Sequence, residues 1–307
     1  MSTTDRKKLI DQSVRFLQHP TVRDTPLSEK LKFLEKKGLT SQEITRALKE
    51  YEEAVSSQTN QIASSMTGLT SGSRLLDRVG VIVGGLSEFG YLVSLRLSQE
   101  GAKLSVVDLA SRKAIGKQHE TDWKIFYGES YDWDFFDTSY KTIANEFGRI
   151  DFIVNCIPIQ NIPIHRLVDQ NTTIQDNLFG KAAHATFLSC KRAIHQMLTQ
   201  QKESICGRIL NVITGHIKHS SKESFEAAVL RHLTHYIATE YGPKGILCNN
   251  IAIDSTFFPA LSACGIDQPP SSEFIKYGED ATNMVLHFVS DQIRCMKGVS
   301  VVLHENA

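Results

Sequence analysis

The sequence predicts an α/β protein with a small helical domain at its N-terminus, and three observations indicate this fold class. In residues 1–54, apolar side chains recur at every third or fourth position in three short segments, as in amphipathic helices. Residues 55–76 are rich in Ser, Thr, Gly, Gln and Asn, which is typical of a flexible linker. Residues 77–307 open with an apolar strand, a glycine turn, a helix and a second apolar strand, which are the parts of a nucleotide-binding α/β unit.

The charge and cysteine content exclude several classes of function. Lys plus Arg and Asp plus Glu both total 34, so no basic surface argues for nucleic acid. The six cysteines have no paired spacing, which argues against zinc or a disulfide framework and favours a reducing compartment. No apolar run reaches membrane-spanning length, and the polar N-terminus does not resemble a secretory signal. We expect a soluble protein, or one held at a membrane by a partner.

Three short helices are predicted in the N-terminal domain. The first covers residues 5–19 and is stopped by Pro20. Ser28 caps the second, which ends at Gly38, and the third begins at Ser41. Their inward stripes consist of Ile10, Val14, Leu17, Leu31, Leu34, Ile44, Leu48 and Tyr51. Such a short unit forms only a marginal core, so we expect its role to be the presentation of a surface.

The segments VRFLQ, VRDTPL and KLKFLEKKGLT follow one another in this domain with a characteristic spacing. Over roughly Lys8 to Tyr51 they resemble the N-terminal domain of peroxin-14, the docking protein of the peroxisomal import machinery. Domains of that family bind WxxxF/Y helices of the import receptor. His19 and Thr21 depart from the Asn and Arg common there, which bears on affinity and partner choice.

The resemblance implies a peptide-binding site in the helical domain. Two aromatic side chains and a lysine line the pockets of the family, and they fall on Phe16, Phe33 and Lys37, with Arg15 and Val22 at neighbouring surface positions. Phe16 and Phe33 lie beside the inward stripes of their helices, where a ring can serve as an anchor for a ligand helix. The alternative is that both rings close the small core. Periodicity alone favours the alternative, and the resemblance favours the binding site.

The glycine turn of the larger domain departs from the usual dinucleotide-binding pattern. Gly85 and Gly90 would bring backbone N–H groups to a pyrophosphate, and Asp108, at the end of the second strand, would accept the ribose hydroxyls. However, Glu88 and Phe89 lie near the place of the middle glycine, and a carboxylate facing a pyrophosphate is unfavourable. The alternative role of Asp108 is to cap the turn that follows its strand. We therefore expect no bound cofactor. If a nucleotide does bind, NAD(H) is the one that this turn would accommodate.

From Val79 onward the sequence resembles the short-chain dehydrogenase/reductase family over nearly the whole domain. The matching segments are FGRIDFIVN, TFLSCKRAIHQML, GRILNVIT, ATEYGPKGILCNNIA and NMVLHFVSD with GVSVVL. The resemblance implies a doubly wound parallel sheet with helices on both faces. It also implies a homo-oligomer, because the helix from Thr186 to Leu198 matches the one at the subunit interface of the family.

The catalytic positions of that family are not preserved. Its chemistry needs a tyrosine as general acid and base and a lysine four residues later, and no Tyr-x-x-x-Lys occurs in the sequence. Alignment without gaps puts Glu223 and Ala227 at these positions, and a shift by one residue puts Lys222 and Glu226 there. Thr214 stands at the position of the carbonyl-polarising serine. Some relatives use an acid with the lysine, which Glu223 could imitate, but the lysine is missing. We expect no catalytic residue.

Two other features are interpreted as structural. The histidine pairs 216 and 219, and 232 and 235, lack a carboxylate or cysteine companion, so we expect no metal site. The aromatic stretch YDWDFF, residues 131–136, is predicted to pack beside the sheet, with a partner site as the alternative.

Two functions follow from these observations. The first is a peroxin-14-like adaptor, peripheral to the peroxisomal membrane, whose dehydrogenase-like domain is inactive. The alternative is a divergent peroxisomal NAD(P)-dependent oxidoreductase for acyl-CoA or carbonyl substrates.

Overall fold

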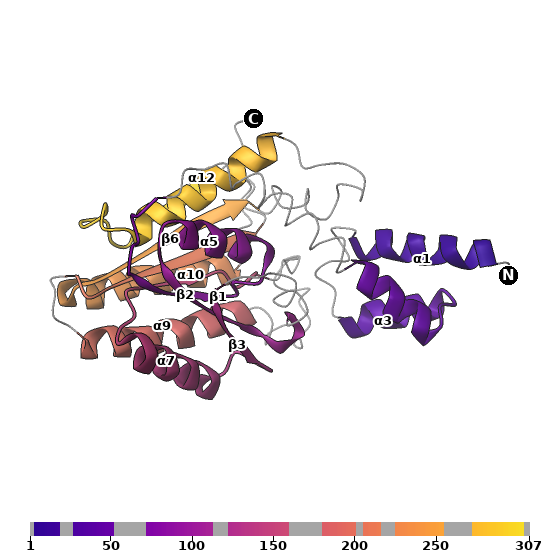
Figure 1. The fold of residues 1–307 in the computed structure, drawn as a ribbon, viewed down its shortest axis with the longest axis horizontal. Helices are drawn as coiled ribbons and strands as arrows, with labels where there is room; N and C mark the ends of the chain where they lie inside the picture. Colours follow the sequence, from indigo (N-terminus) through magenta and orange to yellow (C-terminus); the bar gives the residue numbers. More distant parts are fainter. Residues whose placement is uncertain are drawn as a thin grey trace, which may run out of the picture. The chain divides into compact units, whose positions relative to one another are not determined.

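The chain divides into two compact units, which are described separately. The computed structural model describes residues 3–18, 27–51, 72–112, 122–159, 180–200, 205–215, 225–254 and 272–303 (Figure 1). In the described residues, the first unit contains three helices and the second contains the sheet. The division after residue 65 falls inside the predicted linker, most of which lies outside the described residues.

The first unit is built from α1 (Thr3–Gln18), α3 (Leu27–Lys36) and a helix over residues 41–51. Its inward stripes are those predicted: one cluster holds Leu17, Leu34, Leu39 and Ile44, and a second holds Ile10, Val14 and Ala47. The second helix includes the predicted cap Ser28, because it already begins at Leu27.

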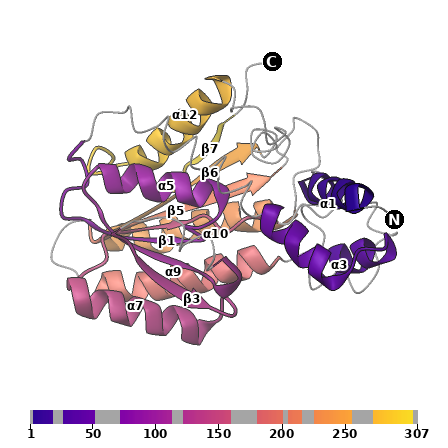
Figure 2. The same cartoon turned by 45° about the vertical axis from the view of Figure 1, so that its right-hand side comes forward.

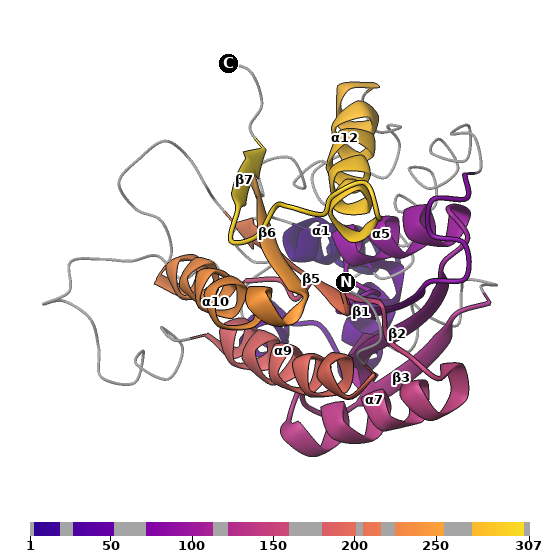
Figure 3. The same cartoon turned by 90° about the vertical axis from the view of Figure 1, so that its left-hand side faces the viewer.

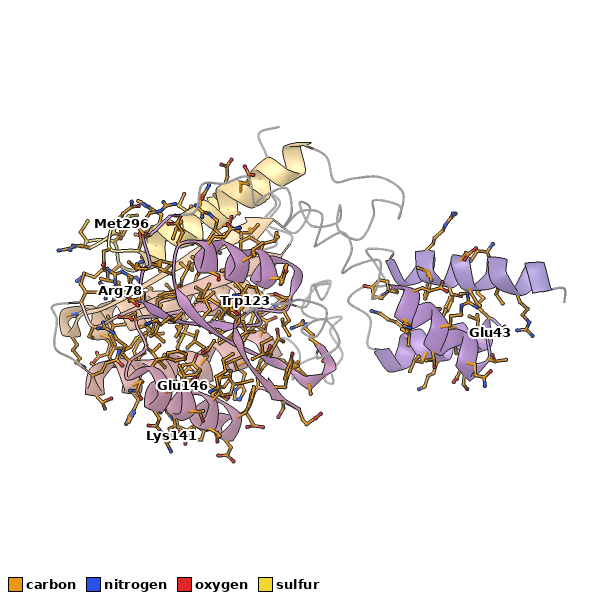
Figure 4. The ribbon with its side chains drawn as sticks, in the orientation of Figure 1. Glu43, Arg78, Trp123, Lys141, Glu146 and Met296 are labelled. Carbon is orange, nitrogen blue, oxygen red and sulfur yellow. The ribbon has the colours of Figure 1, made fainter. Side chains whose placement is uncertain are left out.

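Two local features connect these helices. Gly38 has a φ of +88°, the left-handed conformation that ends α3, as predicted. Thr40 and Glu43 form a capping box: Glu43 Oε2 accepts from the Thr40 N–H at 2.8 Å, and Thr40 Oγ1 accepts from the Glu43 N–H at 3.3 Å. Glu43, labelled in Figure 4, also accepts from Arg6 of α1 at 3.0 Å. The first and third helices are therefore tied by an ion pair as well as by the core.

The second unit contains a seven-stranded parallel sheet in the order β3-β2-β1-β4-β5-β6-β7. Its strands are β1 (Val79–Val83), β2 (Lys103–Leu109), β3 (Lys124–Gly128), β4 (Phe152–Asn155), β5 (Gly207–Gly215), β6 (Ile246–Asp254) and β7 (Ser300–Leu303). The strand order reverses between β1 and β4. In such sheets, ligands bind at the carboxyl ends of the strands on either side of this reversal.

Helices cover both faces of the sheet, which confirms the doubly wound architecture. One face carries α5 (Glu88–Gln99) and α12 (Ser272–Val289), and the other carries α7 (Trp133–Phe147), α9 (Lys181–Thr199) and α10 (Phe225–Tyr241) (Figures 2 and 3). Short 3-10 turns follow β2 at Ala110–Arg112 and α10 at Gly242–Lys244. β1 is buried along its whole length, because both of its faces are covered.

Candidate functional site

The exposed aromatic site of the first unit is centred on two stacked rings. The Phe16 and Phe33 centroids are 4.3 Å apart with an interplanar angle of 17°. Phe16 is half-buried against the Leu17 and Leu34 core, whereas the Phe33 side chain remains 39% exposed. The two rings therefore form a continuous apolar surface that leads from the core to solvent.

Lys37 completes this cluster. Its Nζ lies 5.4 Å from the centroid of the Phe33 ring, one helical turn further along the chain. Arg15 is exposed on α1 beside Phe16, and Val22 lies outside the described residues. Of the five predicted site residues, the structure thus brings Phe16, Phe33 and Lys37 into contact.

The glycine turn after β1 uses many of its amide groups within the chain. The Gly84 N–H donates to Val107 O at 2.9 Å, the Ser87 N–H donates to Gly84 O at 2.9 Å, and the Gly90 N–H donates to Ser87 Oγ at 3.2 Å. A Cβ on Gly90 would lie 2.1 Å from Gly84 O, and a Cβ on Gly85 would lie 2.9 Å from Val106. The glycines are thus required by packing inside the turn itself.

Asp108 is fully buried at the end of β2, and its carboxylate receives four donors. The Leu86 N–H donates to Oδ2 at 2.7 Å, and the Leu109 N–H donates to Oδ1 at 2.7 Å. Arg112 and the Tyr131 hydroxyl also donate to Oδ1, at 2.8 and 2.9 Å. Burial and the neighbouring Asp108 raise the pKa of Tyr131, so its hydroxyl stays a donor.

This arrangement does not fit a dinucleotide. An ionised carboxylate has about two acceptor positions on each oxygen; on Asp108, Oδ1 receives three donors from the chain and Oδ2 receives one. The predicted alternative, in which Asp108 caps the turn after its own strand, describes the Leu109 and Arg112 contacts. The Leu86 contact instead holds the glycine turn after β1, which was not predicted. Gly85, Gly90 and Asp108 do lie together, as the sequence predicts for a nucleotide site, but the Gly90 N–H and the Asp108 carboxylate are used internally.

One of the positions aligned with the catalytic tyrosine and lysine of the family contains a buried acid, and this acid makes a structural contact. Glu226, at the start of α10, is buried, and its Oε1 accepts from the Ala183 N–H of α9 at 2.9 Å. Burial raises the pKa of Glu226, and the Ala183 and Ala182 amides oppose that rise. A Cβ on Gly180 would overlap this carboxylate. The acid therefore holds the N-terminus of the neighbouring helix.

The other residues at these positions offer no proton-transfer group among the described residues. Ala227 is buried in α10, and Thr214 is half-buried at the end of β5, opposite Ile253 of β6. Lys222 and Glu223 lie outside the described residues, as do His216 and His219. His232 and His235 are exposed, and no group of three potential metal ligands occurs in the described part of the chain.

A buried polar chain crosses the domain, and the sequence analysis did not predict it. Tyr140 Oη contacts Ser189 Oγ at 2.8 Å, and Ser189 donates to Asn155 Oδ1 at 2.7 Å. Asn155 then donates to Asn211 at 2.8 Å, which donates to Thr234 at 2.9 Å. The two asparagines inside the apolar strands FIVN and GRILNVIT are the signal that could have revealed it.

The aromatic stretch at residues 131–136 packs beside the sheet, as predicted. Phe136 is fully buried, and its ring lies 5.8 Å from that of Tyr131 and 6.1 Å from that of Tyr140. Trp133 is the exposed member, and Lys191 of α9 lies 4.7 Å from its ring centroid.

Two family models match the chain, one in each unit. Residues 5–50 match the Pex14 N-terminal domain, and residues 85–303 match the model described as enoyl-(acyl carrier protein) reductase. Both resemblances seen in the sequence are thereby confirmed.

Known proteins resemble either one part of the chain or the other. Xanthoxin dehydrogenase of Arabidopsis thaliana is 28% identical over 80% of this chain and 94% of its own length. Peroxisomal membrane protein PEX14 of Pichia angusta is 49% identical over 47 residues, and that of Saccharomyces cerevisiae is 50% identical over 46 residues. These segments are only 13% and 14% of the two PEX14 proteins.

The fold of the larger unit also occurs in a solved structure. The crystal structure of levodione reductase matches 75% of this chain and 96% of its own, with a TM-score of 0.57 and 22% identity. Across the described residues, the helices are too short or too polar to span a membrane.

Proposed function

The chain belongs to the short-chain dehydrogenase/reductase family, and because it also carries a Pex14 N-terminal domain, we propose that it is an adaptor of peroxisomal matrix protein import. Its helical domain binds WxxxF/Y helices of an import receptor or another peroxin. The protein is peripheral to the peroxisomal membrane.

The observation that carries this proposal is the stacked pair of Phe16 and Phe33 with Lys37 beside it. A partly exposed aromatic pair on a helical surface provides an apolar seat for the aromatic side chains of an amphipathic ligand helix. Lys37 supplies a charge that complements acidic residues next to such a motif. Burial of the exposed Phe33 ring by the ligand stabilises the complex.

Calorimetric titration of the full-length protein with a WxxxF/Y peptide tests the proposal. We expect one saturable site, and no binding of a peptide in which both aromatic residues are replaced by alanine. In NMR spectra, the amide signals of Phe16, Phe33 and Lys37 should move when the peptide is added. Unchanged signals for these three residues would sink the proposal.

In this proposal the dehydrogenase-like domain is a scaffold without a catalytic reaction. Support comes from Glu226, whose carboxylate caps α9, and from the absence of any Tyr-x-x-x-Lys in the sequence. A tyrosine acts as a general acid and base at neutral pH only when the adjacent lysine cation lowers its pKa, so the tyrosine and the lysine of this motif act as a unit. Fold alone does not carry activity.

A homo-oligomer is part of the same proposal. Phe187 of α9 and Tyr236 of α10 are 48% and 56% exposed, and these helices form one face of the sheet domain (Figure 3). Exposed large apolar side chains of this kind mark an interaction surface. Light scattering after size exclusion should report a dimer or tetramer, and Phe187→Glu should shift it toward monomer.

A second candidate is a divergent oxidoreductase. Thr214 at the end of β5 favours it, because its hydroxyl can polarise a carbonyl group at the carboxyl edge of the sheet. Nicotinamide-dependent turnover of carbonyl or acyl-CoA substrates, lost in Thr214→Val or Glu223→Gln, would establish this function. Absence of turnover with receptor binding intact favours the adaptor.

A further inference from the structure

We propose that Tyr131 and Arg112 close the adenosine-ribose subsite of the larger domain from within, so that the unaltered chain does not bind NAD(H) or NADP(H). The inference deepens the part of the proposed function that assigns no reaction to this domain. It does not depend on peptide binding by the helical domain.

The position of Asp108 defines the subsite. The sheet order reverses between β1 and β4, and Asp108 lies at the carboxyl end of β2, next to β1. In a doubly wound sheet this is where an acid meets the ribose hydroxyls of a bound dinucleotide. The Leu86 N–H of the glycine turn already points to the same carboxylate, at 2.7 Å.

The four donors on Asp108 fall into two classes. The Leu86 and Leu109 amides belong to the backbone of the turn and of the strand end, so they are fixed by the fold. Tyr131 and Arg112 are side chains that reach the carboxylate from the segments after β3 and β2. Both donate to Oδ1, which also accepts from the Leu109 N–H, so this oxygen has no position left for a ribose hydroxyl, and Oδ2 accepts from the Leu86 N–H.

Packing holds the Tyr131 hydroxyl in place. Its ring stacks on the fully buried Phe136 at an interplanar angle of 11°, and its hydroxyl shares Asp108 Oδ1 with Arg112. The next residue, Asp132, caps α7 by accepting from the Phe135 N–H at 2.9 Å. Tyr131 is therefore anchored between a helix cap and the core, and its displacement would disrupt both contacts.

The charges in the subsite disfavour both forms of the cofactor. A ribose hydroxyl is neutral, so its bond to the carboxylate is weaker than the bond that Arg112 makes. The 2′-phosphate of NADP(H) would add a negative charge next to Asp108, which is 0% exposed. Neither NAD(H) nor NADP(H) therefore offsets the loss of the contacts that Tyr131 and Arg112 make with Asp108.

Titration of the full-length chain with NADH and with NADPH, followed by nucleotide fluorescence, tests the inference. We expect no saturable binding by the unaltered protein up to millimolar concentration. The double substitution Tyr131→Phe with Arg112→Gln removes two of the three donors on Oδ1 and should strengthen NADH binding by about tenfold or more. The control Tyr241→Phe removes a hydroxyl at the C-terminal end of α10, where the ring faces Lys244, and should change nothing.

Two results would overturn the inference: saturable NADH binding by the unaltered chain, or a folded double variant that binds no better. Circular dichroism checks that the variants fold. Tyr131→Phe alone keeps the ring on Phe136, so it decides the question if the double variant does not fold. A WxxxF/Y peptide titrated into the same samples reports on the helical domain separately, so failure of the adaptor function is distinguishable from failure of this inference.

Discussion

The stacked rings of Phe16 and Phe33, with centroids 4.3 Å apart, have different surroundings on their two sides. Phe16 packs against the small core, and Phe33 faces solvent. The same pair of rings therefore contributes both to the stability of the three-helix unit and to its exposed apolar surface. Substitutions at the two positions should separate these contributions.

Phe33→Ala should weaken binding of a WxxxF/Y peptide by about tenfold or more, with a small effect on stability, because the residue is 39% exposed and lies outside the core clusters. Phe16→Ala should weaken binding and also lower the free energy of unfolding by about 2 kcal/mol, because it removes a half-buried ring. Calorimetry and thermal unfolding measure the two effects. Phe225→Ala, an exposed ring on α10, is the control and should leave binding unchanged.

Two glycines inside helices should respond to alanine with opposite signs. A Cβ at Gly90 of α5 would lie 2.1 Å from Gly84 O, so Gly90→Ala should destabilise the chain by about 1–3 kcal/mol. Among the described residues, a Cβ at Gly278 of α12 would meet only Leu92, at 3.9 Å. Gly278→Ala should therefore stabilise by about 0.5–1 kcal/mol, since alanine loses less backbone entropy. Denaturant unfolding of both variants checks the pair, and equal effects would contradict the argument.

Asp151 should contribute far more to the free energy of unfolding than an exposed aspartate does. It is 5% exposed, accepts from the Val79 N–H at 2.8 Å and pairs with Arg78 at 3.3 Å (Arg78 is labelled in Figure 4). Asp151→Asn removes the charge of a buried carboxylate that pairs with the partly exposed Arg78 and Arg149, and should cost about 1–3 kcal/mol in the free energy of unfolding. Asp77 pairs with Lys103 but is 74% exposed, so Asp77→Asn should cause no measurable change in a parallel denaturant titration.

The stability of the chain should contain a pH dependence that comes from Glu226. Burial raises its pKa above the ordinary value of 4.5, so in the pH range between the two values the folded state binds more protons than the unfolded state. The contribution of this group to stability therefore falls as pH rises through the raised pKa. Glu226→Gln keeps a carbonyl for the Ala183 N–H and removes the titration.

Thermal unfolding of both proteins between about pH 4 and 7 measures this difference. The unaltered chain should lose stability relative to Glu226→Gln as pH increases. Glu240→Gln, at an exposed position of α10, should show the same dependence of stability on pH as the unaltered chain. A gap between the Glu226→Gln and unaltered curves that does not change with pH would show that Glu226 contributes no titration.

Sequence patterns predicted the elements that depend on local periodicity. The apolar runs beginning at Val79 and Leu104 are β1 and the core of β2, and Gly38 ends α3 in the left-handed conformation. These features depend on spacing within one segment. The assignment of Phe16 and Phe33 to one site comes from the resemblance to the peroxin-14 domain, since periodicity alone places each ring beside the inward stripe of its own helix and favours a role in the small core.

Contacts between segments could not be predicted in this way. Tyr131 reaches Asp108 only because α7 begins at Trp133 and Phe136 holds the ring. Glu226 meets Ala183 because the N-termini of α9 and α10 lie side by side, which no spacing in the sequence encodes. The acid at the end of β2 was recognisable, whereas the four donors that surround it were not.

The contact between Asp108 and the Leu86 amide has a consequence for how related chains diverge. An acid that accepts a hydrogen bond from the turn after β1 stabilises that turn, whether or not a nucleotide is bound. Mutation and selection can then erase the chemistry of such a domain and still retain its acidic residue. A sequence pattern typical of cofactor binding can therefore persist after cofactor binding is lost, because the same acid still holds the turn.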